Sequence, residues 1–467
     1  MALDLHPSRL GTTNEDGSRA FVYPSDVRGK WKNRRKLAHL LMLAIFLIAP
    51  WLRYGGEQML LIDVVHRRFI FFGHIFWSHD VPVLFLLVLL GFVTILFVTT
   101  IWGRVWCGWA CPQTVFIDAI FRRIERWVEG NHLIRRRRDE QPWSFKRFWR
   151  KTLKWGAYFG VSMVIAHSFI AYFAGAKSML EMMARPPDQN FGYFLVVFSI
   201  TAWIAFDFGW FREQFCIIIC PYGRLQSVIM NDATKVIKYD SGRGEPRRGD
   251  EPKGEKTGDC INCFRCVSVC PTGIDIRRGL QMECISCTAC MDACDEVMSK
   301  VGKPEGLIRY DSLKGEEKAN LWRPEAVAYA LAFVGLLSAF AFVLYTREPL
   351  DYEFLRGRGE PFTLVKEGAD DFVLNHFQVQ VSSQTREDVN IEFKVSAELE
   401  TSGVKLTTPF HPLSLKTGEI KRTGLFIRFP KSMVKNGVAK LTVTTEAQGG
   451  QLKTINQHEI RLVGPFM

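Results

Sequence analysis

The last 173 residues of the sequence contain no cysteine, although the chain as a whole has 12. All 12 lie between Cys107 and Cys294, and each belongs to a repeated motif. Disulfide frameworks are typical of oxidising compartments and exported domains. The restriction of cysteine to one stretch therefore argues against a disulfide scaffold and indicates metal ligation in a reducing compartment.

Signal-peptide and nucleic-acid-binding features are also lacking. Residues 1–36 are polar and contain no apolar core after a short basic stretch, so we expect a polar N-terminal tail without a cleavable signal peptide. The net charge is +12, yet the basic residues are not assembled into a recognisable nucleic-acid-binding module. They cluster between apolar runs, as at a membrane surface, and we expect no nucleic-acid partner.

Five apolar segments come close to the roughly 20 residues that a transmembrane helix needs. They cover residues 37–54, 81–101, 153–176, 191–210 and 324–345. Lys and Arg number eight in residues 1–37 and twelve in 102–152, but only two in 55–80 and two in 177–190. The positive-inside rule therefore places the N-terminus and the 102–152 connector in the cytoplasm, with the run Arg135–Arg138 at the lipid surface. The sequence predicts a five-helix domain in a bacterial inner membrane.

The remaining segments predict two further domains. Residues 211–323 form a cytoplasmic insert, and residues 350–467 follow the fifth span on the periplasmic side. In the latter, apolar and polar residues alternate in short runs separated by turn residues such as Pro412 and Gly437. This pattern predicts an antiparallel β-sandwich with strands in 371–382, 389–397, 424–429, 439–445 and 460–463. The absence of Cys and Trp excludes the cysteine pair and core tryptophan of antibody domains.

Two C-x2-C-x2-C-x3-C runs lie in the insert, and the second is followed by Asp295 where proline is usual. Three thiolates at this spacing wrap around one 4Fe–4S cubane, and the fourth cysteine of each run reaches the other cluster. We therefore expect a bacterial ferredoxin-like domain with two clusters. The predicted ligands are Cys260, Cys263, Cys266 and Cys294 for cluster 1, and Cys284, Cys287, Cys290 and Cys270 for cluster 2.

Four-cysteine zinc sites are the main alternative to these clusters. Structural zinc is usually held by C-x2-C units across longer gaps, whereas three-plus-one runs occur here twice, which favours iron–sulfur. Clusters with a purely structural role are a further alternative. Because 4Fe–4S clusters are redox-active, electron transfer is the expected role.

A C-x3-C-P motif occurs twice, after the second and the fourth predicted span. Each copy has an aromatic residue before its first cysteine and an arginine upstream, and the offset of 109 residues indicates an internal duplication. In helical backbone residues i and i+4 share a face, so each pair of thiols can converge on one metal ion. Thiolates favour Cu(I), zinc or iron–sulfur, and we prefer this role to buried packing. The copies are Arg104, Cys107, Cys111 and Pro112, and Arg212, Cys216, Cys220 and Pro221.

Histidines and methionines in the predicted outer loops are weaker candidates. Three histidines within 14 residues could serve as copper ligands, but interfacial polar residues are the preferred interpretation of His66, His74 and His79. Packing is likewise preferred to thioether ligation for Met179, Met182 and Met183. His167 and Asp207 are functional candidates because they are ionisable residues within predicted spans.

The order of these features resembles the CcoG/FixG/RdxA family, accessory proteins for assembly of cbb-type cytochrome oxidase. Shorter strings agree with the family: residues 49–53 (APWLR), 259–261 (DCI), 270–277 (CPTGIDIR) and 306–311 (GLIRYD). The resemblance covers nearly the whole chain after the first 20 residues. Residues 73–80 depart from it, since His74 and His79 stand where other residues are expected.

The resemblance implies a cupric reductase, an oxidoreductase that reduces Cu(II) to Cu(I) for the copper centre of the oxidase. It also implies an immunoglobulin-like fold for residues 350–467 and electron relay by the two clusters. The oxidase assembly machinery and a copper transporter or chaperone are the implied partners. A thiolate site favours Cu(I) and so adds driving force for reduction. The implied copper ligands are Cys107, Cys111, Cys216 and Cys220.

Two other functions stay open. One is an electron-transfer subunit that links quinone or a flavin to another respiratory enzyme, but the exported β domain and the lack of a flavin-attachment region argue against it. The other is a copper chaperone or scaffold with structural clusters. The sequence does not identify the cytoplasmic electron donor or the cluster potentials. It also leaves open the route of copper and whether the chain forms a homo-oligomer.

Overall fold

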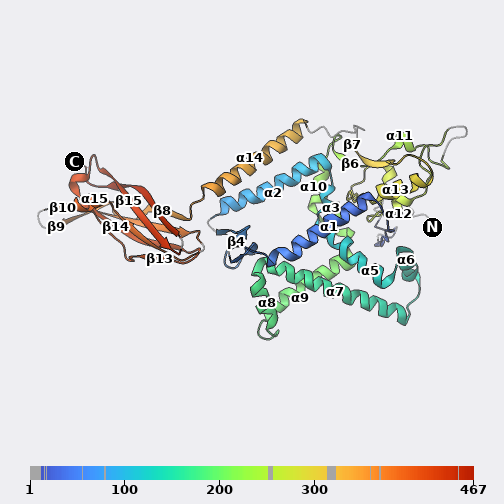
Figure 1. The fold of residues 1–467 in the computed structure, drawn as a ribbon, viewed down its shortest axis with the longest axis horizontal. Helices are drawn as coiled ribbons and strands as arrows, with labels where there is room; N and C mark the ends of the chain where they lie inside the picture. Colours follow the sequence, from blue (N-terminus) through green and yellow to red (C-terminus); the bar gives the residue numbers. More distant parts are fainter. Residues whose placement is uncertain are drawn as a thin grey trace. The chain divides into compact units, whose positions relative to one another are not determined.

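The computed structural model describes residues 12–14, 16, 18–54, 56–77, 80–250, 256–312, 322–357, 359–367, 370–385, 387–450 and 452–466. The chain divides into two compact units, Met1–His74 with Val81–Phe340 and Ile75–Asp80 with Ala341–Met467 (Figure 1). The first unit contains all 12 cysteines. Each unit is a separate body with its own core, and each is described by itself.

Four helices among the described residues are long and apolar enough to cross a membrane. In the first unit α7 packs along α9, and α2 lies beside α14, where Phe97 stacks on Phe333 (Figure 1). The four agree with the second to fifth predicted spans. They are α2 (Val81–Trp102), α7 (Phe145–Ala174), α9 (Phe191–Phe206, extended by the π-helical turn η3, Asp207–Phe211) and α14 (Pro324–Thr346).

The first predicted span, residues 37–54, differs from the helix that forms there. α1 (Lys30–Ile48) begins seven residues earlier and is followed by a single 3-10 turn, η1 (Ala49–Trp51), so the predicted extension to residue 54 is wrong. Four basic residues between positions 32 and 36 occupy its first turns. The apolar remainder, residues 37–48, is about 18 Å long against a hydrocarbon core of about 30 Å. For this reason α1 is not among the four candidate spans.

Contacts at both ends show what α1 connects. In its N-terminal half, the Nε of Arg35 donates to the carbonyl of Gly108 at 2.7 Å. At its other end, the carbonyl of Phe46 accepts from the hydroxyl of Tyr172 at 2.9 Å, near the C-terminus of α7. α1 therefore runs from the region of the first thiol motif to the far end of α7. Whether it is a fifth crossing stays a prediction.

Short elements fill the connectors of the first unit. Small strands follow α1 where a plain loop was expected, and the buried side chain of Gln58 ties them to α7 by donating to the carbonyl of Ala171 at 3.0 Å. The strands are β1 (Arg53–Tyr54), β2 (Glu57–Gln58), β3 (Leu60–Asp63) and β4 (Arg68–Phe71), and β5 (His74–Trp77) falls where the chain passes from the first unit to the second. The helices are α3 (Val105–Trp109), α4 (Pro112–Phe116), the π-helical turn η2 (Ile117–Phe121), α5 (Arg122–Glu129), α6 (His132–Glu140) and α8 (Ala176–Ala184).

The insert is built around a two-stranded antiparallel sheet, β6 (Lys235–Tyr239) with β7 (Ile308–Ser312). Its core joins strand residues such as Ile237 and Ile308 to Cys260 and Cys266, so the cysteines are part of the packing. The surrounding elements are the π-helical turn η4 (Phe215–Ile219), α10 (Pro221–Ile229), α11 (Ser241–Gly244), α12 (Arg265–Ser268), η5 (Ile276–Arg278) and α13 (Ala289–Lys300).

The second unit is a β-sandwich, as the alternating pattern predicts. One sheet has the order β12-β14-β10-β8 with β9 on β10, and the other has the order β13-β11-β15-β16. Leu425, Ile427 and Phe429 on β14 are fully buried between the sheets, with polar residues between them. The strands are β8 (Leu350–Arg356), β9 (Thr363–Glu367), β10 (Asp370–Ser383), β11 (Val389–Lys394), β12 (Lys405–Thr407), β13 (Leu413–Leu415), β14 (Ile420–Pro430), β15 (Val438–Gly449) and β16 (Leu452–Val463).

The strand prediction for this unit is correct in part. The five predicted runs fall in β10, β11, β14, β15 and β16, but residue 397 begins a short helix, α15 (Ala397–Thr401), instead of ending a strand. β12 and β13 have only three residues each, which is too short for an alternating pattern to be visible. η6 (Lys431–Met433) follows β14.

Candidate metal centre

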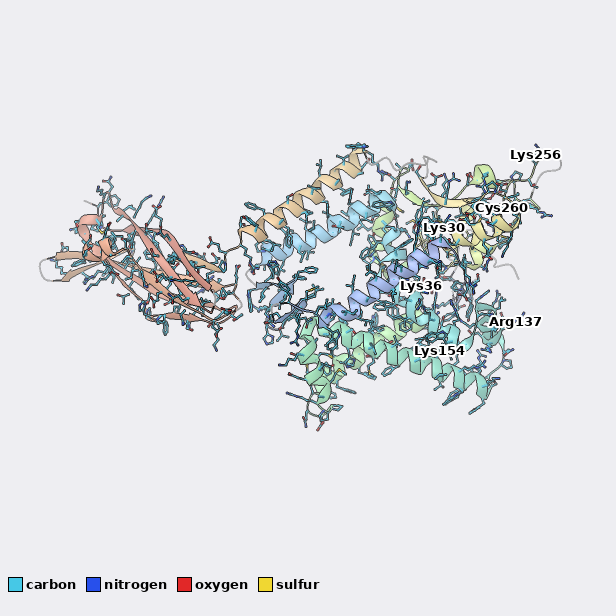
Figure 2. All side chains as sticks on the ribbon, viewed as in Figure 1. Lys30, Lys36, Arg137, Lys154, Lys256 and Cys260 are labelled. Carbon is cyan, nitrogen blue, oxygen red and sulfur yellow. The ribbon has the colours of Figure 1, made fainter. Side chains whose placement is uncertain are left out.

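Two cavities in the insert are lined by the eight cysteines of the two runs, and Cys260 at one of them is labelled in Figure 2. Their empty volumes are about 350 and 340 Å³, so the two spaces are of nearly equal size. The structure brings together the two predicted sets, including the exchange of the fourth cysteine between runs. Cavity 1 is lined by Cys260, Cys263, Cys266 and Cys294, and cavity 2 by Cys270, Cys284, Cys287 and Cys290, with Cys266 at its edge.

The backbone repeats the same unusual turn in both runs. Asn262 and Phe264 have φ of 56° and 55°, and the matching residues of the second run, Ser286 and Thr288, have φ of 52° and 64°. Left-handed conformations are uncommon for residues other than glycine and cost free energy. Their recurrence at equivalent positions curls each run so that its first three cysteines face one cavity.

Zinc and iron–sulfur need different spacings between the thiols. The described residues contain no group of three or more His, Cys, Asp or Glu side chains arranged to hold a single metal ion. A zinc site needs each sulfur about 2.3 Å from the ion, which keeps the sulfurs within about 4 Å of one another. In a four-iron cubane each thiolate binds a different iron, so a wider set of thiols fits.

Burial makes these thiols poor thiolates on their own. It raises the pKa of Cys266, Cys284 and Cys294 to about 12 in each case. A metal ligand must be deprotonated, so the positive charge of bound iron has to stabilise the thiolates. The donor set and its apolar surroundings therefore fit a 4Fe–4S cluster in each cavity.

The two C-x3-C-P motifs share a local structure that differs from the predicted helix. Cys107 lies in α3 and Cys216 in η4, but Cys111 and Cys220 are extended residues that immediately precede the prolines opening α4 and α10. The continuous i, i+4 face is therefore wrong. Instead, the N–H of Cys111 donates to the carbonyl five residues back at 2.9 Å, and the N–H of Cys220 does the same. The duplication inferred from sequence is thus repeated in the backbone.

The four motif thiols lie in one neighbourhood. The side-chain amide of Gln226, on α10 after the second motif, donates to the Sγ of Cys107 in the first at 3.3 Å. Burial raises the pKa of Cys107 to about 11, with Cys111 and Cys220 adding to the rise. Burial also raises the pKa of Cys216, again with contributions from the other three thiols. At Cys111 burial outweighs two backbone N–H groups that favour its thiolate, and the pKa is raised.

The first motif packs directly on the cluster 2 loop. A Cβ on Gly108 would come within 3.0 Å of the carbonyl oxygens of Ile285 and Ser286, the two residues between Cys284 and Cys287. Arg104 bridges the same parts, since its guanidinium donates to the carbonyl of Cys284 at 3.4 Å and to that of Gly223 at 2.8 Å. The motif thiols and cavity 2 are therefore adjacent.

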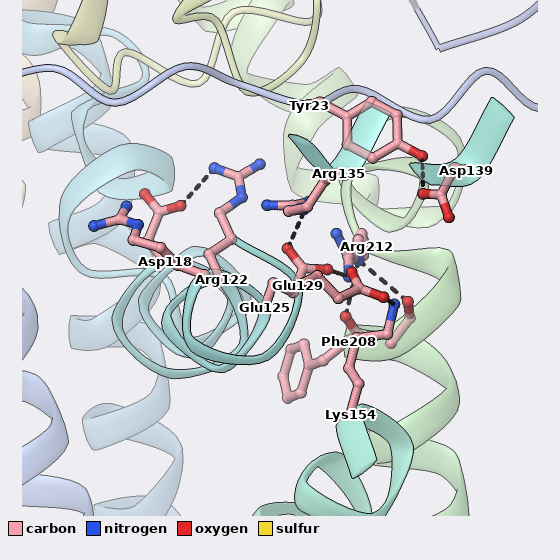
Figure 3. A network of polar contacts seen from close by, with 12 residues as sticks. Tyr23, Asp118, Arg122, Glu125, Glu129, Arg135, Asp139, Lys154, Phe208 and Arg212 are labelled. Atoms are coloured by element: carbon pink, nitrogen blue, oxygen red, sulfur yellow. Dashed lines mark hydrogen bonds and ion pairs between the residues drawn. The ribbon is translucent and has the colours of Figure 1, made fainter. Parts of the chain in front are cut away.

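A buried ion network holds the two motifs together (Figure 3). Glu125 on α5 pairs with Arg212, just before the second motif, and with Arg135 at 2.8 Å. Burial alone would raise the pKa of Glu125, but Arg212 and Arg135 outweigh it and lower the pKa to about 2. Asp118 pairs with Arg122 at 2.6 Å and also with Arg35 of α1. The network anchors α1, α5 and the start of the second motif.

Of the weaker candidates, only Asp207 lies near this site. His66 is exposed and bonds Asp63 at 2.8 Å, His74 is exposed, and His79 lies outside the described residues. Asp207 is buried in η3, where its carboxylate interacts with the side chain of Gln113, two residues after Cys111. The other candidates share a large apolar cavity between α7, α8 and α9, distinct from the two cysteine cavities: His167, Met179, Met182 and Met183.

Sequence reasoning noted Arg104 and Arg212 only as neighbours of the motifs and missed Gln226, Gly108 and Glu125 altogether. The two arginines recur upstream of both motifs, which was the available signal. Gln226 lies 119 residues from its partner Cys107, and Glu125 lies 87 residues from its partner Arg212. No local spacing in the sequence indicates such distant partners.

Three family models match the chain. One described as a 4Fe-4S dicluster domain covers residues 211–313, and one described as a 4Fe-4S binding domain covers residues 84–138, which include Cys107 and Cys111. The third, described as an IG-like fold at the C-terminal of FixG, a putative oxidoreductase, covers residues 340–465. The matches assign iron–sulfur binding to the first unit and an immunoglobulin-like fold to the second.

Several known proteins have sequences similar to this chain over most of their length. The proteins RdxA and RdxB of Cereibacter sphaeroides are each 34% identical, RdxA over 79% of this chain and 80% of its own length, and RdxB over 85% of each. The nitrogen fixation protein FixG of Rhizobium meliloti is 28% identical over 95% of this chain and 93% of its own. The crystal structure of a FixG-related protein from Vibrio parahaemolyticus aligns with 25% of this chain and 97% of its own at 13% identity, but its TM-score of 0.19 supports no argument.

Proposed function

The chain belongs to the FixG/RdxA family of membrane-associated iron–sulfur electron-transfer proteins, and from that premise we propose that it is a cupric reductase. In this proposal it reduces Cu(II) to Cu(I) for assembly of a cbb-type cytochrome oxidase. The thiol motifs and the ferredoxin-like insert face the cytoplasm, and the immunoglobulin-like domain faces the periplasm. An electron donor in the cytoplasm and a copper transporter or chaperone complete the pathway.

One observation carries the proposal: the four half-buried thiols of the C-x3-C-P motifs lie next to cavity 2. The close approach of Gly108 to Ile285 and the hydrogen bond from Arg104 to Cys284 put the first motif in direct contact with the loop of cavity 2. When bound, two 4Fe–4S clusters held by the predicted ligand sets supply single electrons, which matches the one-electron reduction of Cu(II).

The thiols themselves account for the choice of metal. Cu(II) prefers nitrogen and oxygen ligands, whereas Cu(I) prefers sulfur, so a site built from thiolates stabilises the reduced ion. A pair such as Cys107 and Cys111 offers two sulfurs and no nitrogen. Because burial raises the pKa of Cys107 to about 11, binding of the cation must release its proton. The amide of Gln226 then retains a hydrogen bond to the sulfur.

Anaerobic titration tests this proposal. Protein reduced with dithionite and freed of excess reductant receives Cu(II), and Cu(I) is measured with a chromogenic chelator. We expect stoichiometric Cu(I) with matching oxidation of the clusters by electron paramagnetic resonance. In Cys107→Ser/Cys216→Ser, Cu(I) formation and copper retention should fall at least tenfold while iron content and the cluster spectrum persist. His66→Ala, which changes an exposed residue, is the matched control for adventitious copper binding.

Three results contradict the proposal. The first is quinone reduction by the reduced protein at a rate that copper does not change, with no Cu(I) formed. The second is a protein whose clusters dithionite cannot reduce. The third is iron in clear excess of about eight atoms per chain that Cys107→Ser/Cys216→Ser removes. That result would assign the motif thiols to a further cluster, in line with the family match over residues 84–138.

A further inference from the structure

A basic cavity lies between α6 and the start of α7, with an empty volume of about 700 Å³. Six cationic and two carboxylate side chains line it, together with Gln141, Pro142 and Ser144. None of them takes part in the copper chemistry proposed above. The charged residues are Glu129, Arg135, Arg138, Asp139, Lys146, Arg147, Arg150 and Lys151.

The two carboxylates already have cationic partners. Glu129 pairs with Lys151 at 3.1 Å and with Lys154 at 2.9 Å, and Lys154 is turned toward it (Figure 3). Asp139 accepts from Lys151 at 2.6 Å and from the hydroxyl of Tyr23 at 2.5 Å. These pairs neutralise the acidic side chains, so the remaining cations give the cavity a net positive charge.

Two of the remaining cations lack an anionic partner among the described residues. Lys146 and Arg150 form no ion pair in the part of the chain that the structure describes. Arg147 pairs with Asp139 at 3.8 Å, but its Nε is buried and has no hydrogen-bond partner among the described residues. A buried guanidinium N–H without an acceptor is costly, so the position fits an external acceptor oxygen.

The N-terminus of α7 also favours an anion in this cavity. Ser144 caps the N-terminus of α7, a helix of 30 residues, and it also lines the cavity. Free backbone N–H groups and the helix dipole favour an anion at such a position. The dipole, Lys146 and Arg150 therefore act on the same space.

The length of α7 places the cavity at the edge of the membrane. The helix is about 45 Å long, whereas the hydrocarbon core is about 30 Å thick, so about ten residues project beyond the core. The basic residues of α7 all lie in its first ten positions. Trp143, Phe145 and Trp149 are 72%, 84% and 61% exposed beside them, as aromatic residues at a membrane interface are.

From this geometry we infer that the cavity binds the phosphate headgroup of an anionic phospholipid. Phosphate is the anion that matches clustered Arg and Lys donors, and the exposed aromatic rings favour a ligand whose acyl chains continue into the bilayer. The site is independent of copper and of the clusters. It would attach the connector between α2 and α7, and with it the ion network around Glu125, to the membrane surface.

Native mass spectrometry of the full-length protein in detergent tests the site. We expect the wild-type protein to retain phosphatidylglycerol in preference to phosphatidylcholine. Each basic residue near an anionic surface contributes roughly fivefold in affinity, so Lys146→Gln/Arg150→Gln should bind about 25-fold more weakly. The matched control, Arg136→Gln/Arg137→Gln, removes the same charge from the neighbouring helix at positions that do not line the cavity and should bind as wild type. The charge-conserving pair Lys146→Arg/Arg150→Lys should retain binding.

Three outcomes overturn the inference. The first is a wild-type protein that binds phosphatidylglycerol and phosphatidylcholine equally well, which contradicts the inference without the need for any variant. Equal losses in the cavity variant and its control reveal diffuse surface charge instead of a site. Inorganic phosphate or glycerol phosphate that displaces the lipid at equal concentration identifies a soluble ligand. Iron content, measured for every variant, shows that the first unit has folded.

Discussion

Gly108 is the residue on which the contact between the first thiol motif and the cluster 2 loop depends. It has no side chain at a position where a Cβ would meet the backbone oxygens of Ile285 and Ser286, which cannot turn aside as a flexible side chain can. Arg35 and His39 of α1 also hydrogen-bond to its carbonyl. Gly108 therefore contacts both the cluster 2 loop and α1.

Replacing Gly108 with alanine tests this contact. We expect Gly108→Ala to cost about 1–3 kcal/mol of stability, because the loop must move away, and to slow Cu(I) formation while the clusters stay reducible. Thermal unfolding and the anaerobic copper titration measure the two effects. Gly91→Ala is the control, since nothing lies within 4 Å of a Cβ there. Equal behaviour of the two variants would show that the contact has no role.

Glu125 is the second residue whose charge has a structural role. With Arg212 and Arg135 as partners it remains ionised inside the protein. Glu125→Gln leaves two buried guanidinium groups without their anion, and we expect a loss of about 3–5 kcal/mol. The thermal midpoint should fall clearly below that of Glu140→Gln, which changes an exposed carboxylate. A midpoint equal to that of the control contradicts this account.

At the scale of elements, each cysteine run contributes its fourth cysteine to the cavity of the other run. Cavity 1 takes Cys294 from α13, and cavity 2 takes Cys270 from the first run. Repeated left-handed residues place the first three thiols of each run, whereas α13, which contains the end of the second run, carries Cys294 to cavity 1. Neither run can form a complete set of four by itself.

Paired substitutions test this exchange. Cys270→Ser/Cys284→Ser removes two ligands of one predicted cluster, so about four irons per chain should remain. Cys260→Ser/Cys284→Ser removes one ligand from each cluster and should leave close to none. Iron analysis and electron paramagnetic resonance distinguish the variants. If the first pair loses both clusters and Cys270→Ser/Cys260→Ser loses only one, the ligands are not exchanged.

At the scale of the whole molecule, the two units depend on different kinds of core. The first includes cysteines among its buried residues, with Cys260 and Cys266 packed beside Ile237 and Met298. The second has no cysteine and an apolar core between two sheets. Cluster binding is therefore a part of the folding free energy of the first unit only.

Iron removal should separate the two units in a calorimetric scan. After treatment with a chelator and an oxidant, we expect the transition that includes the insert to shift down or broaden. The transition of the second unit should keep its midpoint within about 2 °C, because none of its contacts involves a cluster. Limited proteolysis should then cut the insert before the sandwich. A single transition that shifts as a whole would show that the units unfold together.

Local patterns were sufficient for much of this protein. Long apolar runs predicted α2, α7, α9 and α14, and alternation predicted the long strands of the sandwich, because periodicity and length are local properties. The same reasoning failed for α1, whose basic first turns join an apolar stretch too short to be a clear span, and for β12 and β13, which are too short to show a period.

For the candidate site, sequence by itself determined which atoms are available: twelve thiols in two kinds of motif, with cluster ligands grouped by spacing. Tertiary structure decided what surrounds them. The contact of Gly108 with the cluster 2 loop, the bond from Gln226 to Cys107 and the pairing of Glu125 with Arg212 join residues 87 to 178 positions apart. Such neighbours arise because packing brings distant segments together, and no local spacing encodes them.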